Sequence, residues 1–243
     1  MLYAWYFSSK EISRAKKEET KKVKAKVNTD EAVASPTVEN TIELTFINQS
    51  NDMNNSDVVI FAKNAAESFN EICVAWKVIK NCGRGWSHKF NYPMGFHVGA
   101  QDAYGNTSNQ NQASFGQKWE IVHTASGDQI QLSTEPASSF NEVELQNSME
   151  RGSIDAGIYK DGNLFLTKTG VSPAQKAVFS FKPTFWIGVV SQVQQGEVIN
   201  SAIISSVNTE ISLLGISKAN IIMTGGGTGP NATPFSFELQ PTA

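Results

Sequence analysis

Hydrophobic and polar residues alternate along most of the chain after residue 40. In TIELTFIN, for example, Ile42, Leu44 and Phe46 alternate with polar neighbours, a pattern typical of a strand with one buried face. Similar segments recur between clusters of Asn, Gly, Ser and Asp, among them DVVIFAKN, MGFHVGA, KWEIVHT, NEVELQN, DAGIYKDGNLFLT, FWIGVVSQ, ANIIMT and FSFELQ. No window keeps a 3.6-residue period, and only AESFNE and VSPAQKA could each form a helical turn. The pattern predicts an all-β fold, an antiparallel two-sheet β-sandwich of roughly 12 to 14 strands.

Two strand-turn-strand segments of this pattern resemble each other. IELTFINQS is followed by DVVIFAKN, and EVELQNSM is followed by DAGIYKDG, so that Asn48 aligns with Asn147 and Asp57 with Asp155 at nearly equal separations. NYPMGFHVGAQ and FKPTFWIGVVSQ extend the likeness, because both place a proline before an aromatic-rich strand. We therefore predict an internally duplicated unit with halves at residues 39–134 and 139–243, packed as one two-sheet body or as two small sandwiches. The alternative is that the segments share only residues common to all strands.

The start of the chain differs in composition from the rest. The 243 residues carry 20 basic and 23 acidic side chains, a net charge of −3, yet the segment from Lys10 to Lys26 is strongly basic and poor in large apolar residues. We expect residues 1–38 to be a charged extension, helical or disordered, that adds nothing to the core. MLYAWYF has no basic residue before it, and no segment reaches the roughly 20 apolar residues of a membrane span, so we expect neither a signal peptide nor a spanning helix. Cys73 and Cys82 are expected to be buried thiols, which favours a cytoplasmic location.

Catalytic and metal-binding motifs are missing from the sequence. His88, His97 and His123 are isolated, without the spacing of a metal site, and we expect no metal and no cofactor. TGGGTGP is followed by a strand-like segment rather than by a helix, which favours a hairpin connection over a phosphate loop. There is no GxSxG motif, and neither cysteine lies in a catalytic signature. We therefore expect a protein that is not an enzyme.

The segment NCGRGWSHKFNYPM has the densest group of side chains that are common in binding sites. It presents Arg84, Trp86, His88 and Tyr92, and aromatic and guanidinium groups are enriched at interface hot spots. In an extended segment Trp86, His88 and Tyr92 lie on one face. These four residues are the candidate site for a ligand or partner. The alternative is that this face packs into the core.

These observations leave three functions open. The leading one is a non-enzymatic binding or structural β-sandwich that binds a partner protein or self-associates into a homo-oligomer, because many strands provide many edges. The second is a membrane-interacting or pore-forming protein that uses MLYAWYF and the lysines after it at a membrane surface. The third is a hydrolase whose catalytic groups come from distant loops. No nucleic-acid partner is expected, because the body of the protein is acidic.

Overall fold

The computed structural model describes residues 40–66, 72–199 and 209–242, which belong to one compact unit, Glu39–Ala243. Eighteen strands and one short 3-10 helix form the regular structure of these residues. The prediction of an all-β fold is confirmed. No helix in the described ranges is long and apolar enough to cross a membrane. The predicted extension, residues 1–38, lies outside the described residues, as does most of the segment AESFNE.

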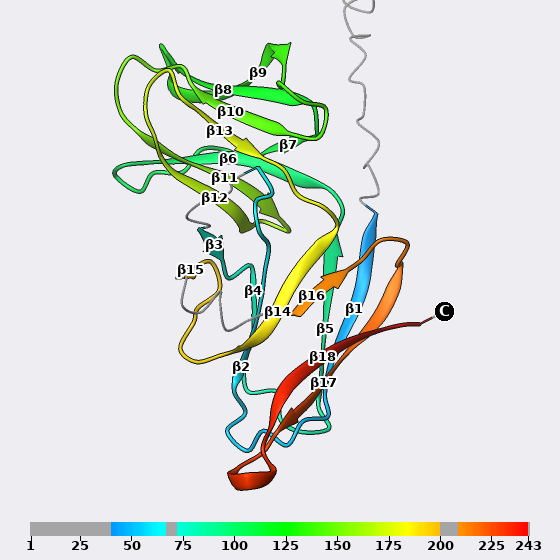
Figure 1. The fold of residues 1–243 in the computed structure, drawn as a ribbon. Helices are drawn as coiled ribbons and strands as arrows, with labels where there is room; N and C mark the ends of the chain where they lie inside the picture. Colours follow the sequence, from blue (N-terminus) through cyan, green and yellow to red (C-terminus); the bar gives the residue numbers. More distant parts are fainter. Residues whose placement is uncertain (1–39, 67–71, 200–208, 243) are drawn as a thin grey trace, which may run out of the picture. The chain divides into compact units, whose positions relative to one another are not determined.

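Two of the four sheets face each other, and β1 is an inner strand of one while β2 is an inner strand of the other (Figure 1). The first has the order β18-β17-β1-β5, formed by Thr233–Pro241, Lys218–Gly226, Thr41–Asn48 and Ser87–Pro93. The second has the order β16-β14-β2-β4, formed by Thr209–Ser212, Thr184–Val190, Asp57–Phe61 and Lys77–Ile79. Ile42, Leu44 and Phe46 of β1 are all buried, because alternate side chains of a strand point to the same face of the sheet.

The other two sheets lie together around β10 and β11 (Figure 1). One has the order β13-β10-β8-β9, formed by Lys176–Phe179, Val143–Asn147, Gln117–Thr124 and Gly127–Pro136. The other has the order β15-β3-β12-β11-β6-β7, formed by Val198–Ile199, Cys73–Val74, Asn163–Val171, Ile154–Lys160, Phe96–Asp102 and Asn111–Ala113. Side chains from all four sheets join one hydrophobic core.

The sheets differ from the expected arrangement in their number and in their pairing. Four sheets stand where two were predicted. Most neighbours are antiparallel, but β1 pairs with β17 and β8 pairs with β10 in parallel. The two strands of a parallel pair are joined by a long connection, so a local sequence pattern cannot predict that they pair. Each sheet also contains strands from both predicted halves, residues 39–134 and 139–243, if β9, which ends at Pro136, is counted with the first half. The halves are therefore not two separate sandwiches.

Two short segments test the predictions of local structure. VSPAQKA forms a turn that contains Ala174 at a φ of +64° and leads into β13, and it is not helical. TGGGTGP forms the connection between β17 and β18 together with the 3-10 turn Gly229–Asn231, as the hairpin interpretation predicted. Cys73 and Cys82 are buried thiols, also as predicted.

A buried lysine stabilises the passage of the chain from β5 to β6. The side chain of Lys160 is only 2% exposed. Its ammonium group donates hydrogen bonds to the carbonyl oxygens of Pro93 at 2.6 Å and Gly95 at 3.4 Å, and it lies 4.5 Å from the centre of the Tyr92 ring. Tyr92 in turn packs edge-on against Trp76, with ring centres 5.5 Å apart. The lysine therefore satisfies backbone carbonyls that the bend between two sheets leaves without ladder partners.

Candidate binding surface

Short polar side chains fix the loop between β1 and β2, residues 49–56. The side-chain oxygen of Asn48 accepts hydrogen bonds from the backbone N–H of Ser50 at 2.8 Å and from its hydroxyl at 2.6 Å. The carboxylate of Asp52 accepts bonds from the backbone N–H groups of Asn54 at 3.0 Å and Ser56 at 2.6 Å. Such side-chain to backbone bonds replace the ladder bonds that a loop lacks, so this loop has a defined conformation.

The loop between β4 and β5, residues 80–86, is attached to the first loop by side chains. Two hydrogen bonds join the loops, Arg84 Nη1 to Asn51 Oδ1 at 2.8 Å and Asn55 Nδ2 to Asn81 Oδ1 at 3.2 Å. A third, from Asn48 Nδ2 to the Cys82 carbonyl at 2.6 Å, attaches the second loop to the end of β1. The bond from Asn48 is buried, and the other two are exposed. The guanidinium group of Arg84 is thus held in place at the surface.

Trp86 projects from this loop while its backbone is held on both sides. Its N–H donates to the Gly83 carbonyl, and its own carbonyl accepts from the Asn48 N–H, both at 3.0 Å. Gly85, at a φ of +81°, makes the tight turn before it. The Trp86 side chain is nevertheless 70% exposed. The interpretation of Trp86 as a core residue is therefore wrong, and a large aromatic group is presented to solvent on a fixed backbone.

A third loop, residues 227–232 between β17 and β18, adjoins the first. The Asn51 N–H donates to the Gly225 carbonyl at 2.7 Å. At Gly226, whose φ is +79°, an added Cβ would lie 2.7 Å from the Phe235 ring and 3.2 Å from the Asp52 nitrogen, so only glycine allows this approach. A cleft of about 330 Å3 lies between the two loops, and Met53 on its rim is 83% exposed.

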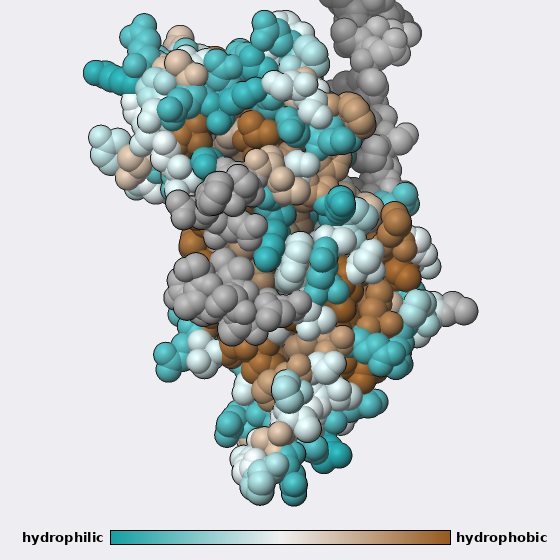
Figure 2. Space-filling view, in the orientation of Figure 1, coloured by the Kyte–Doolittle hydropathy of each residue, from teal (hydrophilic) through white to brown (hydrophobic). Residues whose placement is uncertain are grey.

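We name the three loops, residues 49–56, 80–86 and 227–232, the end-loop surface. Hydrophilic side chains surround this end of the molecule, at the bottom of Figure 2. Arg84 and Trp86, two of the predicted site residues, lie in it. The sequence interpretation missed Asn51 and Met53, although the polar run QSNDMNNSD around them indicated a structured loop.

The other two predicted site residues, His88 and Tyr92, lie on β5, outside the end-loop surface. His88 is exposed, and partial burial together with the nearby Lys77 lowers its pKa. Tyr92 is only 1% exposed, and burial raises its pKa. Its hydroxyl has no hydrogen-bond partner among the described residues. The structure therefore places Tyr92 in the core, away from any partner that touches Trp86.

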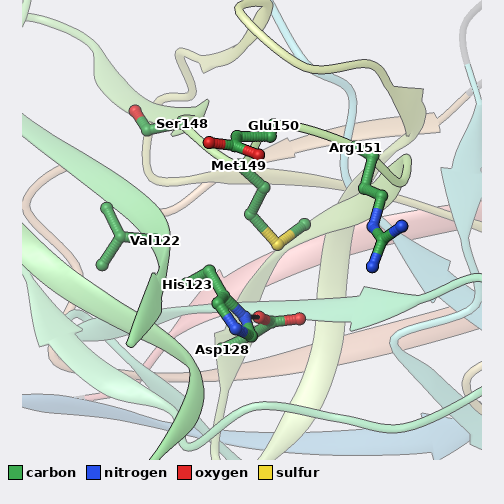
Figure 3. Close-up of a pocket in the computed structure, with 7 residues that line it drawn as sticks. All are labelled: Val122, His123, Asp128, Ser148, Met149, Glu150 and Arg151. Carbon is green, nitrogen blue, oxygen red and sulfur yellow. Dashed lines mark hydrogen bonds and ion pairs between the residues drawn. The ribbon is translucent and has the colours of Figure 1, made fainter. Parts of the chain in front are cut away.

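A second cleft, of about 760 Å3, lies between the β8–β9 hairpin and the loop after β10 (Figure 3). His123 and Asp128 face each other across the hairpin, with Nδ1 and Oδ1 2.7 Å apart. The Met149 side chain points toward this pair, and the Arg151 guanidinium lies beside the same opening (Figure 3). The cleft can accommodate a polar ligand.

Chemical groups in the second cleft are not arranged as a nucleophile and its base. Ser148 lines the cleft, but no hydrogen bond among the described residues joins it to His123, whose side chain is 76% exposed. A nucleophilic serine requires a base within hydrogen-bond reach. Within the described ranges there is likewise no group of three or more His, Cys, Asp or Glu side chains that could hold a metal ion.

Comparison with known proteins yields one match. A protein-family model described as RhiA matches residues 39–221, about three quarters of the chain. The matched region begins just before β1, contains two of the three loops of the end-loop surface and ends within β17. No curated protein and no solved structure matches the chain.

Proposed function

The chain belongs to the RhiA family, and from this premise we propose that it is a non-enzymatic binding protein that recognises a partner protein through the end-loop surface. The observation that carries the proposal is the exposure of Trp86 on a backbone held by hydrogen bonds. Burying a large apolar side chain is worth about 1.5 to 3 kcal/mol. Folding leaves most of that free energy unused at Trp86, so it is available to a partner.

We propose in addition that the fold consists of two interleaved repeats. The support comes first from Asn48 and Asn147, which are both buried at the ends of central strands. Each accepts a bond at its side-chain oxygen from the N–H two residues later. Each also donates from its amide to a carbonyl three residues before the positive-φ residue that bonds its own backbone, Cys82 for Asn48 and Val171 for Asn147, and Asn147 donates in addition to Gly152. Buried asparagines that share such partners are much more specific than shared strand residues.

The sheet topology supports the same repeats. The orders β18-β17-β1-β5 and β9-β8-β10-β13 both run through antiparallel, parallel and antiparallel pairs. The order β4-β2-β14-β16 and the last four strands of the six-stranded sheet, β12-β11-β6-β7, are both fully antiparallel. In the latter two, Asp57 lies opposite Val190 of β14, and Asp155 lies opposite Gln101 of β6. Each repeat thus completes its sheets with strands of the other.

Comparison of the two proposed repeats indicates whether folding requires the Trp86 side chain. Gly85 and Trp86 bond to the backbone of Asn48 as Ala174 and Gln175 bond to that of Asn147, and both Gly85 and Ala174 have positive φ. At this position of the second repeat an exposed glutamine is sufficient. The fold therefore requires only the backbone here. The indole of Trp86 is best explained by recognition rather than by folding.

The chemistry of the end-loop surface favours a protein partner. Trp, Arg and Met are the side chains enriched where proteins meet, and Trp86, Arg84 and Met53 are all exposed here. Arg84 is already fixed by Asn51, which lowers the entropy lost when it contacts a partner. The amides of Asn51, Asn54 and neighbouring residues provide a polar rim.

The test is the replacement Trp86→Gln, which inserts the residue of the second repeat. Tyr104→Ala is the matched control, because Tyr104 is 92% exposed on a different loop. Wild type and both variants are immobilised at equal density and exposed to the proteins of the source cell. We expect a partner retained by wild type and by Tyr104→Ala to lose at least about tenfold in affinity with Trp86→Gln. Equal retention by all three proteins would refute the proposal.

A further inference from the structure

Strand β9 forms an open edge of its sheet. It is ten residues long, Gly127–Pro136, and it pairs only with β8 among the described residues. The pairing is regular from Gly127 to Leu132, and an irregularity follows. Neither face of the strand is buried, and Leu132 is 52% exposed. The outer N–H and C=O groups of this strand are thus accessible for pairing with another strand.

The other edge strands of the described sheets carry the features that prevent such pairing. β4, β7, β13, β15 and β16 have only two to four residues. β5 contains Lys89 and Pro93, and β18 contains Pro234, Glu238 and Pro241. In β9, by contrast, the charges Asp128 and Glu135 and the terminal Pro136 lie at the ends, and the interior QIQLST has neither charge nor proline. The comparison with β18 matters most, because β18 holds the same place in the matching sheet order.

We infer that β9 pairs antiparallel with β9 of a second copy of this chain. The resulting homodimer joins the two four-stranded sheets β13-β10-β8-β9 edge to edge into one continuous eight-stranded sheet. A two-fold axis places the same strand on both sides of the contact, as in most homodimers. Residues opposite each other must both direct their backbone groups outward or both inward. Within the regular part of β9, Gly127 to Leu132, an even-numbered residue therefore lies opposite an even-numbered one.

This rule removes the electrostatic obstacle to self-pairing. Of the two acidic residues of β9, only Asp128 lies in the regular part of the strand, and Glu135 lies beyond the irregularity. With Ile130 on the axis, Asp128 lies opposite Leu132, which carries no charge. Gln129, Gln131 and Ser133 would form a polar ladder on one face, in keeping with the hydrophilic surface over β8 and β9 in Figure 2. A second copy is therefore the best-matched occupant of this edge.

The experiment measures molar mass by light scattering after size exclusion, across a concentration series of the full chain. We expect wild type to reach twice 26.5 kDa, and Leu132→Asp to remain at the monomer mass, because it brings a new carboxylate to the paired edge. Leu214→Asp is the matched control, since Leu214 is 79% exposed in a turn between β16 and β17, and it should still dimerise. Gln131→Lys, on the opposite face of β9, is a second variant that should also give the monomer.

A wild-type protein that stays monomeric throughout the series would overturn the inference, as would a dimer that survives both Leu132→Asp and Gln131→Lys. A thermal melt of each variant shows that it is folded. The inference goes beyond the proposed recognition of a partner protein and does not depend on it. Trp86→Gln should leave the dimer intact, and Leu132→Asp should leave the partner affinity of the end-loop surface within about twofold, so failure of one leaves the other standing.

Discussion

Replacing the two buried asparagines tests the proposed repeats directly. Asn147→Ala removes two donated bonds, to the carbonyls of Gly152 at 2.8 Å and Val171 at 2.9 Å, and one bond accepted from the Met149 N–H at 3.1 Å. Asn48→Ala also removes three bonds, one donated to the Cys82 carbonyl and two accepted from Ser50. If the two residues hold equivalent places in two repeats, the two replacements should cost similar free energies of unfolding.

The expected size follows from those contacts. Each net hydrogen bond is worth about 1 kcal/mol, and a buried group left without a partner adds about 1 to 3 kcal/mol. Of all these partners only Gly152 is exposed and regains water. We expect a loss of roughly 2 to 4 kcal/mol at each site, with the two values within about 1 kcal/mol of each other. The two asparagines share no hydrogen-bond partner, so the double variant should show an additive loss.

Urea denaturation followed by tryptophan fluorescence measures these losses, provided that the m-value stays constant. Asn109→Ala is the control, because Asn109 is exposed, and it should change the free energy of unfolding by less than about 0.5 kcal/mol. A loss below about 0.5 kcal/mol at one buried asparagine with more than about 3 kcal/mol at the other would refute their equivalence, and with it the strongest support for the repeats.

Three further predictions have definite expected outcomes. Gly226→Ala should lower the melting temperature by several degrees, because its φ of +79° and a Cβ only 2.7 Å from a phenylalanine ring both oppose a side chain; an unchanged temperature would contradict this. Burial raises the pKa of Glu144, but hydrogen bonds led by that of Lys176 outweigh it and lower the pKa below 4.5. The stability from this ionised group is present above pH 4.5 and is lost as the pH falls through the lower folded pKa, so Glu144→Gln should flatten the acid branch of stability against pH, and an unaltered branch would count against the pair. Trp76→Ala should cost about 3 to 5 kcal/mol in denaturation, because Trp76 is fully buried, whereas Trp86→Ala should cost less than about 1 kcal/mol; similar losses would show that Trp86 is a packing residue.

Alternation in the sequence predicted the strands well because it is a local consequence of the fold. Ile42, Leu44 and Phe46 are 4%, 1% and 0% exposed, and each could be assigned from its two neighbours in the sequence. The partners of a strand are a different matter. β1 lies between β17 and β5, and nothing near β1 in the sequence marks a strand more than 150 residues later as its neighbour. The hydrophobic pattern therefore could not predict the number of sheets or the parallel pairs.

The candidate site shows the same limit on a smaller scale. Residue parity correctly distinguishes the two faces of β5, but it does not tell how far along the strand a face is covered by another sheet. Phe90 and Tyr92 lie where the face is covered and are buried, whereas Trp86 and His88 lie toward the strand's start and are exposed. How much of β5 is covered depends on where the strands of the facing sheet end. This follows from the assembly of the sheets and not from the residues near β5 in the sequence.

Buried polar residues provide the main support for the proposed repeats. Hydrophobic alternation is shared by every strand with one buried face, so it cannot relate one pair of strands to another. An asparagine that ends a central strand is different, because burying its amide is tolerated only if specific partners satisfy it. Asn48 and Asn147 have such partners in Cys82 and Val171, which hold matching places in the proposed repeats. If the repeats are real, a side chain that differs between two places of the same backbone, as Trp86 differs from Gln175, is not required for folding, and this is why we attribute Trp86 to binding in our proposal.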